Sequence, residues 1–460
     1  MSILESRELK ISALIGFISI FSSVVYIQLV YYYDFLLIPI TLILLYLLLF
    51  GGAVYSFSKK EGYYSTIVIW GVGCFLYYIA LPIELYVTQT DTFSISLLTL
   101  QTSSRQLIKI VVAGIIAFLA FTIGYRLSGF NPLGRLSEQQ VRQRVIPNSV
   151  FFLLMICLIA LPLGFYPQFV LSSTYEGNYT ISYLDSLYAV VTTFAYFAAV
   201  IVGGALLIRS GLMASFLGFL LLGLALGWGL YSSNKDPLLL TLLALGAPYA
   251  KRKLYQAQLL PQIFLAVLVT SILFMLFSSF RAGQLNPETL ANIRYSLLNF
   301  DPAGPFVSLV TVTQRPSPLR FGETYLDSFY LLIPRFLWAE RPLDLSVIFA
   351  QEMIPRWQPG QGFGYSLLAE AYLNFSWLGV LLQYFLIGLF WGYLWKGIRR
   401  IFWYFSNDFW LSFYWVWGFY ILLTMHRAPL AGTVKSLVQA SVLFFIFSFY
   451  LDAARWTNRR

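Results

Sequence analysis

Apolar residues in this chain come in long uncharged runs that are separated by short polar stretches. A helix needs about 20 mostly apolar residues to cross the hydrocarbon core of a bilayer. Most of the runs reach that length, but the one at 236–250 is shorter and contains Gly246 and Pro248, which indicates a short or partly re-entrant span. The predicted spans are 11–30, 35–56, 64–88, 107–129, 147–166, 182–208, 211–230, 236–250, 258–280, 372–395, 403–424 and 434–452.

The same runs argue against the other fold that can span a membrane. Strands of a transmembrane barrel alternate apolar and polar residues over about ten positions. Residues 35–50 and 110–121 carry no charge and show no such alternation. The pattern therefore predicts an all-α, polytopic membrane protein in which residues 1–460 form one domain of about 12 transmembrane helices.

Composition supports lipid as the main solvent of the chain. Of the 460 residues, 59% are hydrophobic and only 11% are charged, whereas soluble domains carry about 25% charged residues. Both cysteines, Cys74 and Cys157, fall in predicted spans, so we expect no structural disulfide. Residues 1–10 carry mixed charge and the first run lacks a small-residue cleavage site, so we expect it to be a retained span.

The distribution of basic residues predicts an orientation. With the N-terminus in the cytoplasm, 18 lysines and arginines lie on the inner side, against 5 in the short outer loops. Basic residues in short loops favour the cytoplasmic side. We therefore predict an inner-membrane protein with both termini in the cytoplasm, and the net charge of +10 does not indicate nucleic acid binding.

Residues 281–371 then form one long extracytoplasmic loop, and loops of this length are usually functional or disordered. Its apolar and aromatic content disfavours disorder. Asn286, Pro287 and Glu288 have the pattern of a helix start, which predicts a helix over 286–299. A second, amphipathic helix is predicted over 323–333, and the rest of the loop is expected to be flexible.

Every basic residue in this loop is an arginine, and the arginine fork suits bidentate recognition of phosphate or carboxylate. Arg281 follows a span directly, Arg335 lies in the loop, and Lys235 and Arg427 sit at two other outer helix ends. We expect these four cations to converge on a diphosphate head group. Plainer interpretations stay open: Arg281 can be an interfacial side chain, Lys235 can pair with Asp236, and the eight loop acids can pair with the arginines.

Glu370 and Asn374 are four residues apart at the start of a span, so they share one helix face. Glu370 can simply interact with the helix dipole. The sharper hypothesis is that it orients an acceptor or accepts a proton beside a lipid-linked substrate. With His426 as the one histidine, and with no nucleotide-binding or nucleophile-elbow motif, the sequence predicts no metal and no cofactor.

Two segments resemble a known family. Gly322–Tyr325 followed by Ile333–Pro342 resembles the Pro-Arg … Lys-Pro stretch of Wzy-type O-antigen polymerases, with Arg341 in place of the usual lysine. Gly362–Phe375 is similar to the family's Glu-Ala-Tyr-X-Asn-Phe signature. Ser376 stands where a glycine is common, and we expect this difference to be harmless.

Shorter stretches add to the resemblance. Ser233–Lys235 and His426–Arg427 are similar to the family's other outward basic positions, and the resemblance is concentrated in 231–435. It implies a GT-C-like bacterial glycosyltransferase, independent of metal, that joins oligosaccharide repeat units carried on undecaprenyl diphosphate at the outer face of the inner membrane. It implies catalytic roles for Arg281, Arg335 and Glu370, and substrate-binding roles for Lys235, Arg427, Tyr372 and Asn374.

Besides the lipid-linked substrate and the bilayer, the partners that this implies are a chain-length regulator and a repeat-unit flippase. Two other functions are alternatives to polymerisation. An O-antigen ligase shares the topology but typically has a histidine in its large loop, and residues 281–371 contain none. A flippase or exporter of lipid-linked oligosaccharide is expected to have charges in many spans and two similar halves, neither of which the sequence shows.

Overall fold

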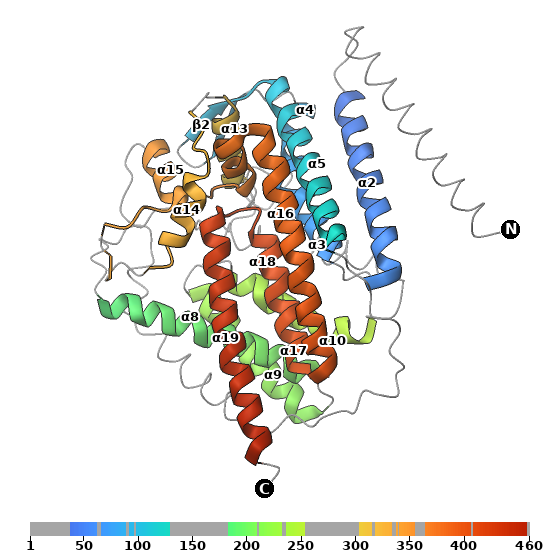
Figure 1. The fold of residues 1–460 in the computed structure, drawn as a ribbon, viewed down its shortest axis with the longest axis vertical. Helices are drawn as coiled ribbons and strands as arrows, with labels where there is room; N and C mark the ends of the chain where they lie inside the picture. The colour runs from blue at the N-terminus through green and yellow to red at the C-terminus, as the bar shows by residue number, and fades with distance from the viewer. Residues whose placement is uncertain are drawn as a thin grey trace, which may run out of the picture.

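The structure is a computed structural model, and it describes residues 37–61, 66–88, 92–95, 98–128, 183–208, 211–231, 236–253, 303–314, 318–333, 337–338, 340–354, 364–405 and 408–457. Within these residues the fold is helical apart from one short hairpin (Figure 1). The predicted helical class is thereby confirmed for this part of the chain. The predicted spans 11–30, 147–166 and 258–280 and the predicted helix 286–299 lie outside the described residues.

Helices occupy the remaining predicted spans. The helical segments are α2 (Leu37–Glu61), α3 (Thr66–Cys74), η1 (Phe75–Ala80), α4 (Leu81–Val87), α5 (Ser104–Leu127), α8 (Tyr183–Ile208), α9 (Leu212–Tyr231), α10 (Asp236–Lys253), α16 (Leu367–Phe405), α17 (Asp408–Phe413), η4 (Tyr414–Gly418), α18 (Phe419–Thr424) and α19 (Leu430–Thr457). Helix α10 runs through Gly246 and Pro248 without a break, and its apolar stretch Leu238–Ala247 is short, as predicted for this span.

Three helices among the described residues are long and apolar enough to cross a membrane. They are Thr66–Tyr86, Ser104–Leu127 and Leu367–Leu394, which correspond to the predicted spans 64–88, 107–129 and 372–395. Shorter apolar stretches occur in α2, α8, α9, α10, α18 and α19. Helix α8, which occupies the predicted span 182–208, lies across the direction of α16 and α19 in Figure 1.

Helices α5 and α16 form the centre of the bundle and lie side by side along their length (Figure 1). They run in the same direction, because Ile110 and Leu368 line one pocket near their N-terminal ends, and Gly392 lies against Ser128 further along both helices. A Cβ at Gly388 would overlap the backbone oxygen of Phe121. Small residues at such a contact let two helix backbones approach closely, which is typical of packing in membranes.

The long loop contains more helix than the sequence predicts. Helices α13 (Ala303–Gln314) and α15 (Leu345–Met353) lie in segments that we expected to be flexible, so that expectation is wrong there. The apolar side of α13 is buried against α5 and α16, and Ser308 Oγ accepts a hydrogen bond from Ser366 N at 2.9 Å. Helix α15 begins at an N-cap, since Asp344 accepts from Ser346 N at 2.8 Å.

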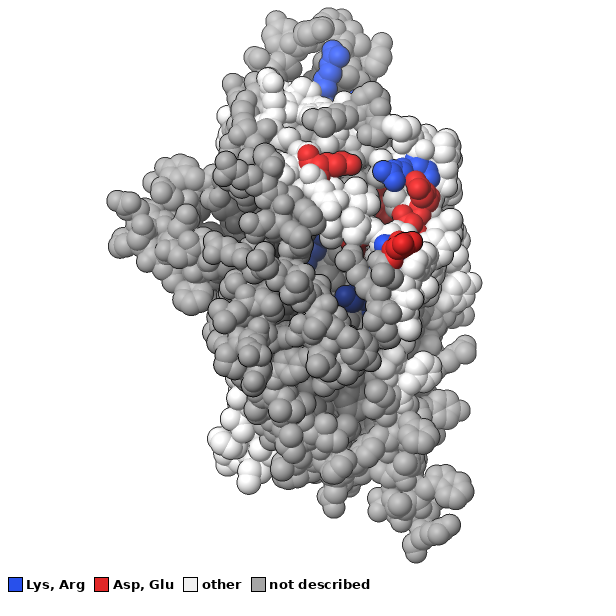
Figure 2. Space-filling view, turned by 90° about the vertical axis from the view of Figure 1, so that its left-hand side faces the viewer, with Lys and Arg blue, Asp and Glu red and all other residues white. Residues whose placement is uncertain are grey.

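The predicted helix over 323–333 is present as α14 (Glu323–Tyr330), but it is oriented in an unusual way. Its polar residues Thr324 and Ser328 are buried, while Leu326 is 60% exposed and Phe329 is 59% exposed. The polar side therefore packs onto the bundle and the apolar side faces outward. Figure 2 shows that the charged side chains visible on this side of the molecule gather in its upper half, at the level of α14 and α15.

The connector between α4 and α5 holds a short antiparallel hairpin that the sequence analysis did not predict. Strand β1 (Thr92–Ile95) pairs with β2 (Leu98–Gln101), with Thr92 opposite Gln101. Both strands alternate polar and apolar residues, which is the usual strand signal. Gln314 Nε2 at the end of α13 donates to Gln101 O, so the hairpin is tied to the long loop.

Candidate functional site

Glu370 lies in the first turn of α16 and is buried, with both carboxylate oxygens accepting hydrogen bonds. Thr324 Oγ1 of α14 donates to Oε1 at 2.8 Å. The backbone N–H of Leu430, at the N-terminus of α19, donates to Oε2 at 2.5 Å. A carboxylate is favoured beside the N–H groups that begin a helix. Glu370 therefore joins the long loop and the last helix to α16.

Asn374 completes this contact from the next turn of α16. Its Nδ2 donates to Thr324 Oγ1 at 2.7 Å and to Glu370 O at 2.9 Å, and its Oδ1 accepts from Gly322 N at 2.9 Å. We call Glu370, Asn374 and Thr324, with the backbone of Gly322 and Leu430, the loop anchor. The predicted pairing of Glu370 and Asn374 on one helix face is thus observed, with α14 as its partner.

The backbone of α16 is interrupted directly after the loop anchor. Phe375 has φ −142° and Ser376 has φ 52° and ψ −138°, a conformation that L-residues rarely adopt. The interruption frees the carbonyl oxygens of Leu373 and Asn374, which accept from Arg320 N and Phe321 N, both at 3.2 Å. The local backbone at position 376 therefore suits glycine better than serine.

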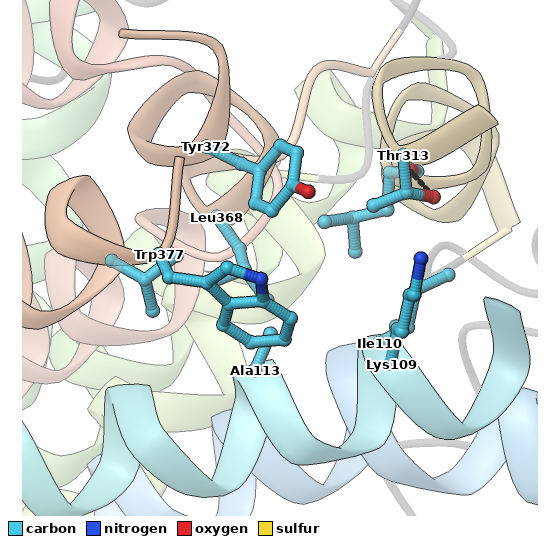
Figure 3. A pocket seen from close by; sticks show the side chains of 9 residues that line it. Lys109, Ile110, Ala113, Thr313, Leu368, Tyr372 and Trp377 are labelled. Carbon is cyan, nitrogen blue, oxygen red and sulfur yellow. Dashed lines mark hydrogen bonds between the residues drawn. The ribbon is translucent and has the colours of Figure 1, made fainter. Parts of the chain in front are cut away.

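Tyr372 points away from the loop anchor and lines a pocket on the other face of α16. The pocket is shallow, has room for about one water molecule, and lies between α5, α13 and α16. Figure 3 shows Lys109 of α5, Tyr372 and Trp377 of α16 directed toward a common space. The two rings of Tyr372 and Trp377 meet edge to face with centroids 5.8 Å apart.

Of the four predicted cations, Arg427 lies within the described residues and is partly buried in the turn between α18 and α19. Arg281, Arg335 and Lys235 lie outside the described residues, so their convergence with Arg427 stays a prediction. Two other loop arginines have protein partners. Arg320 forms an ion pair with Glu323 at 3.3 Å, and Arg341 donates to Ile333 O at 2.9 Å.

His426 does not face outward as its place beside Arg427 led us to expect. It is buried among Trp70, Tyr77 and Tyr78, with its ring centroid 4.3 Å from that of Trp70. Burial away from water lowers the pKa of His426 to about 3, because the charged imidazolium is disfavoured there. It is therefore a neutral packing residue at physiological pH, and the prediction of an outward basic residue at position 426 is wrong.

Sequence reasoning did not assign roles to Thr324, Lys109 or Trp377. Thr324 belongs to the stretch Gly322–Tyr325 that resembles the family. Its contacts with α16, however, join residues that are about 50 positions apart in the sequence. Lys109 could have been found as a charge within a predicted span, since such residues are rare and usually functional. Trp377 follows the signature by two residues and comes directly after the interruption at Ser376.

Comparison with protein families gives an independent result for the C-terminal part of the chain. Residues 347–460 match the family model described as O-antigen polysaccharide polymerase Wzy. The match covers about a quarter of the chain, and it includes Glu370, Tyr372, Asn374 and Arg427. It confirms the resemblance predicted from the signature at 362–375 and, with the apolar helices, indicates a membrane protein. No curated protein and no solved structure matches the chain.

Proposed function

We propose that this protein polymerises lipid-linked oligosaccharide repeat units, of O-antigen or a related polysaccharide, at the outer face of the bacterial inner membrane. The observation that carries the proposal is the family match over 347–460, which contains the signature residues Glu370 and Asn374. The loop anchor adds support, because in it the signature residues Glu370 and Asn374 hold α14 and the first residue of α19 against α16. The proposal includes about 12 spans, a GT-C-like arrangement and cytoplasmic termini.

The reaction proposed is the transfer of a growing chain from undecaprenyl diphosphate to a new lipid-linked unit. A hydroxyl oxygen of the new unit attacks the anomeric carbon of the growing chain. The bond from that carbon to the diphosphate oxygen breaks, a glycosidic bond forms, and the hydroxyl proton is released. No metal is assigned to this step. Both substrates are held by their lipid anchors, so the membrane supplies part of their orientation.

In this scheme the basic residues stabilise the departing diphosphate. Preorganised positive charge is most effective where a leaving group becomes negative in a site shielded from water. We assign this task to Arg281, Lys235, Arg335 and Arg427, as the sequence predicts. A bidentate arginine contact also fixes the orientation of the diphosphate, which a lysine does not do.

We assign Glu370 a positioning role in addition to the predicted catalytic one. Both of its oxygens already accept hydrogen bonds from the protein, and the side chain is 1% exposed. Through Thr324 it holds α14, and with it the segment that leads to Arg335, against the outer end of α16. The carboxylate thereby places the loop where a lipid-linked substrate would be bound.

The test uses cells that lack this protein and carry variants on a plasmid. Loss of polymerisation should leave surface lipid capped with a single repeat unit, whereas the wild-type plasmid restores the ladder of lengths. Arg281→Ala should abolish the ladder, since losing one such donor slows a reaction by about 100- to 1000-fold. Arg294→Ala, in the same loop, should keep it. A normal ladder in cells without the protein would refute the proposal.

A flippase would give a different result in isolated membranes. Membranes that contain the wild-type protein should lengthen radiolabelled lipid-linked repeat units without added nucleotide sugar. A flippase would move these units across the membrane without lengthening them. A ligase would join them to a second lipid acceptor and leave their length unchanged.

A further inference from the structure

His426 lies in the turn between α18 and α19, and its imidazole is enclosed by aromatic rings from α3 and η1. Its ring centroid is 4.3 Å from that of Trp70, 5.8 Å from that of Tyr77 and 5.2 Å from that of Tyr78. We call these three residues the imidazole cage. Ring pairs prefer offset and edge-to-face arrangements, so the cage fixes the direction of the imidazole as well as its depth.

Gly73 of α3 gives the imidazole its room. A Cβ at this position would overlap Nε2 and Cδ2 of His426. Neither ring nitrogen of His426 has a hydrogen-bond partner within the described residues. Packing therefore holds the ring, and the space beside Gly73 is matched to its size. In an interior filled this closely, displacing one side chain also shifts the backbone that carries it.

The imidazole cage is itself fixed on the two central helices. Trp70 stacks on Phe121 of α5 with ring centroids 4.1 Å apart, and the hydroxyl oxygens of Tyr78 and Tyr384 of α16 are 3.0 Å apart. Tyr78 belongs to the π-helix η1, and π-turns occur frequently at functional sites. The position of His426 is thus set by α5 and α16, and α16 also carries the loop anchor.

Arg427 lies in this turn between two fixed points. On one side His426 is held by the imidazole cage, and on the other the Leu430 N–H donates to Glu370 Oε2 at 2.5 Å. The backbone N–H of Arg427 donates to Thr424 O at 3.1 Å. The place of the Arg427 backbone therefore depends on contacts made by its neighbours on both sides.

We infer that His426 is a positioning residue for Arg427, so that the imidazole cage sets the place of this cation. The inference rests on the proposed function, in which Arg427 stabilises the departing diphosphate. A cation is most effective when it is already in place as the negative charge develops, because no reorganisation is then needed. His426 is closed to solvent, so it acts through Arg427 without touching the substrate.

The test measures how fast membranes lengthen radiolabelled lipid-linked repeat units, per molecule of folded protein. His426→Ala should lower kcat by about 10- to 100-fold, since a misplacement of about 1 Å in a catalytic group can have an effect of this size. KM should stay unchanged, because the lost interaction is made in the transition state. A kcat equal to that of the wild type would overturn the inference, because His426 would then affect only the amount of folded protein.

A double-mutant cycle separates positioning from a general packing role. If His426 acts through Arg427, the double variant His426→Ala/Arg427→Ala should be no slower than Arg427→Ala alone. Independent contributions would instead multiply, and multiplied losses would overturn the inference. A wild-type rate in Arg427→Ala would overturn it as well, since there would be no cation to position.

Gly73→Ala reaches the same turn from α3 without changing a polar group. Its methyl group should displace the imidazole and lower kcat as His426→Ala does. In the His426→Ala background the ring that it would overlap is absent, so Gly73→Ala should cause no further loss. The matched control is Gly52→Ala in α2, whose added methyl meets no atom within 4 Å and should leave the rate unchanged.

A wild-type rate in Gly73→Ala would overturn the inference. If His426→Ala does not fold, Gly73→Ala takes its place in the cycle with Arg427→Ala, and the same outcomes apply. Wild-type membranes that lengthen the units, combined with losses that multiply, would remove the positioning role and leave the polymerase. Wild-type membranes that make no polymer would refute the proposed function, and the inference with it.

Discussion

Thr324 donates its hydroxyl proton to Glu370 at 2.8 Å and accepts a proton from Asn374 at 2.7 Å. A threonine hydroxyl has one proton to give, so these two contacts fix its direction. The acidic and amide residues of the signature therefore contact the same loop residue with opposite hydrogen-bond polarity. Glu370 is suited to accept from Thr324 and Asn374 to donate to it, because exchanging these two side chains would leave a buried polar group without a hydrogen-bond partner.

Glu370→Gln should disturb this arrangement although it keeps the shape of the side chain. Its amide NH₂ must face the Leu430 N–H or the Thr324 hydroxyl, which are both donors. We expect the free energy of unfolding to fall by about 1–3 kcal/mol, the usual effect of an unpaired buried polar group. Thermal unfolding in detergent measures this change, and the surface ladder measures the accompanying loss of polymerisation.

Thr324→Val separates positioning by Glu370 from proton transfer. Valine keeps the volume of threonine and leaves the carboxylate in place with its Leu430 contact. If Glu370 acts by holding the loop, Thr324→Val should lose most of the ladder as Glu370→Gln does. A full ladder in Thr324→Val, beside a roughly 100-fold loss in Glu370→Gln, would instead assign Glu370 to proton transfer.

Ser376→Gly should stabilise the protein. Residues held at φ 52° and ψ −138° cost about 1–3 kcal/mol when they carry a Cβ, and glycine removes most of that cost. The greater freedom of glycine in the unfolded chain offsets part of the gain. We expect the unfolding temperature to rise. Ser215→Gly, in the regular helix α9, should lower it, and a lower temperature for both variants would contradict the prediction.

Gly388→Ala should weaken the contact of α5 with α16. The added methyl group overlaps the backbone of Phe121, and overpacking of this kind typically costs about 1–3 kcal/mol. Gly223→Ala in α9 is the control, since its added methyl meets no atom within 4 Å and alanine favours helix. Thermal unfolding should therefore separate the two variants in opposite directions, and equal unfolding temperatures would exclude a tight contact at Gly388.

The buried position of His426 predicts that stability falls in mild acid. The pKa of His426 is about 3 in the folded protein and about 6.5 when unfolded, so the unfolded chain takes up the proton first. The contribution of the neutral His426 to the free energy of unfolding is complete above pH 6.5 and decreases as the pH falls toward 3. At pH 5 this contribution has fallen by about 2 kcal/mol. Unfolding temperatures at pH 8 and pH 5 should differ less in His426→Phe than in the wild type. The same difference in both would contradict the assignment.

Cysteine labelling tests the predicted orientation in a background without Cys74 and Cys157. Leu326 is exposed on α14, in the predicted outer loop, so a membrane-impermeant maleimide should label Leu326→Cys in intact cells. Gln140→Cys lies in a predicted cytoplasmic loop and should be labelled only after the membrane is opened. Labelling of Gln140→Cys in intact cells would contradict the predicted orientation.

Long uncharged runs were sufficient to predict α5 and α16. In lipid, a spanning helix must form all its backbone hydrogen bonds internally and must present apolar side chains to the hydrocarbon. Helix α13 escaped prediction because its 12 residues are too short to span, and its apolar face signals burial only once α5 and α16 are in place. The N-cap signal of α15 at Asp344 was present in the sequence and was overlooked.

The candidate site was predictable in part for the same kind of reason. A spacing of four residues placed Glu370 and Asn374 on one face of a helix, and the structure agrees. Their partner Thr324 and the backbone of Ser376 depend on tertiary contacts, which override local preference. The orientation of His426 was mispredicted because its neighbour Arg427 suggested an outer loop, whereas the turn directs the imidazole toward Trp70.

The close approach of α5 and α16 has a consequence for exchanging gene segments between related proteins. The family match covers α16 and α19, but α5 lies well before it in the sequence. A chimaera that imports residues 347–460 alone would place a foreign α16 against the native α5. The backbone of α5 at Phe121 leaves room only for a glycine at the position of Gly388 in α16. Recombination that preserves activity is therefore expected to transfer both helices together.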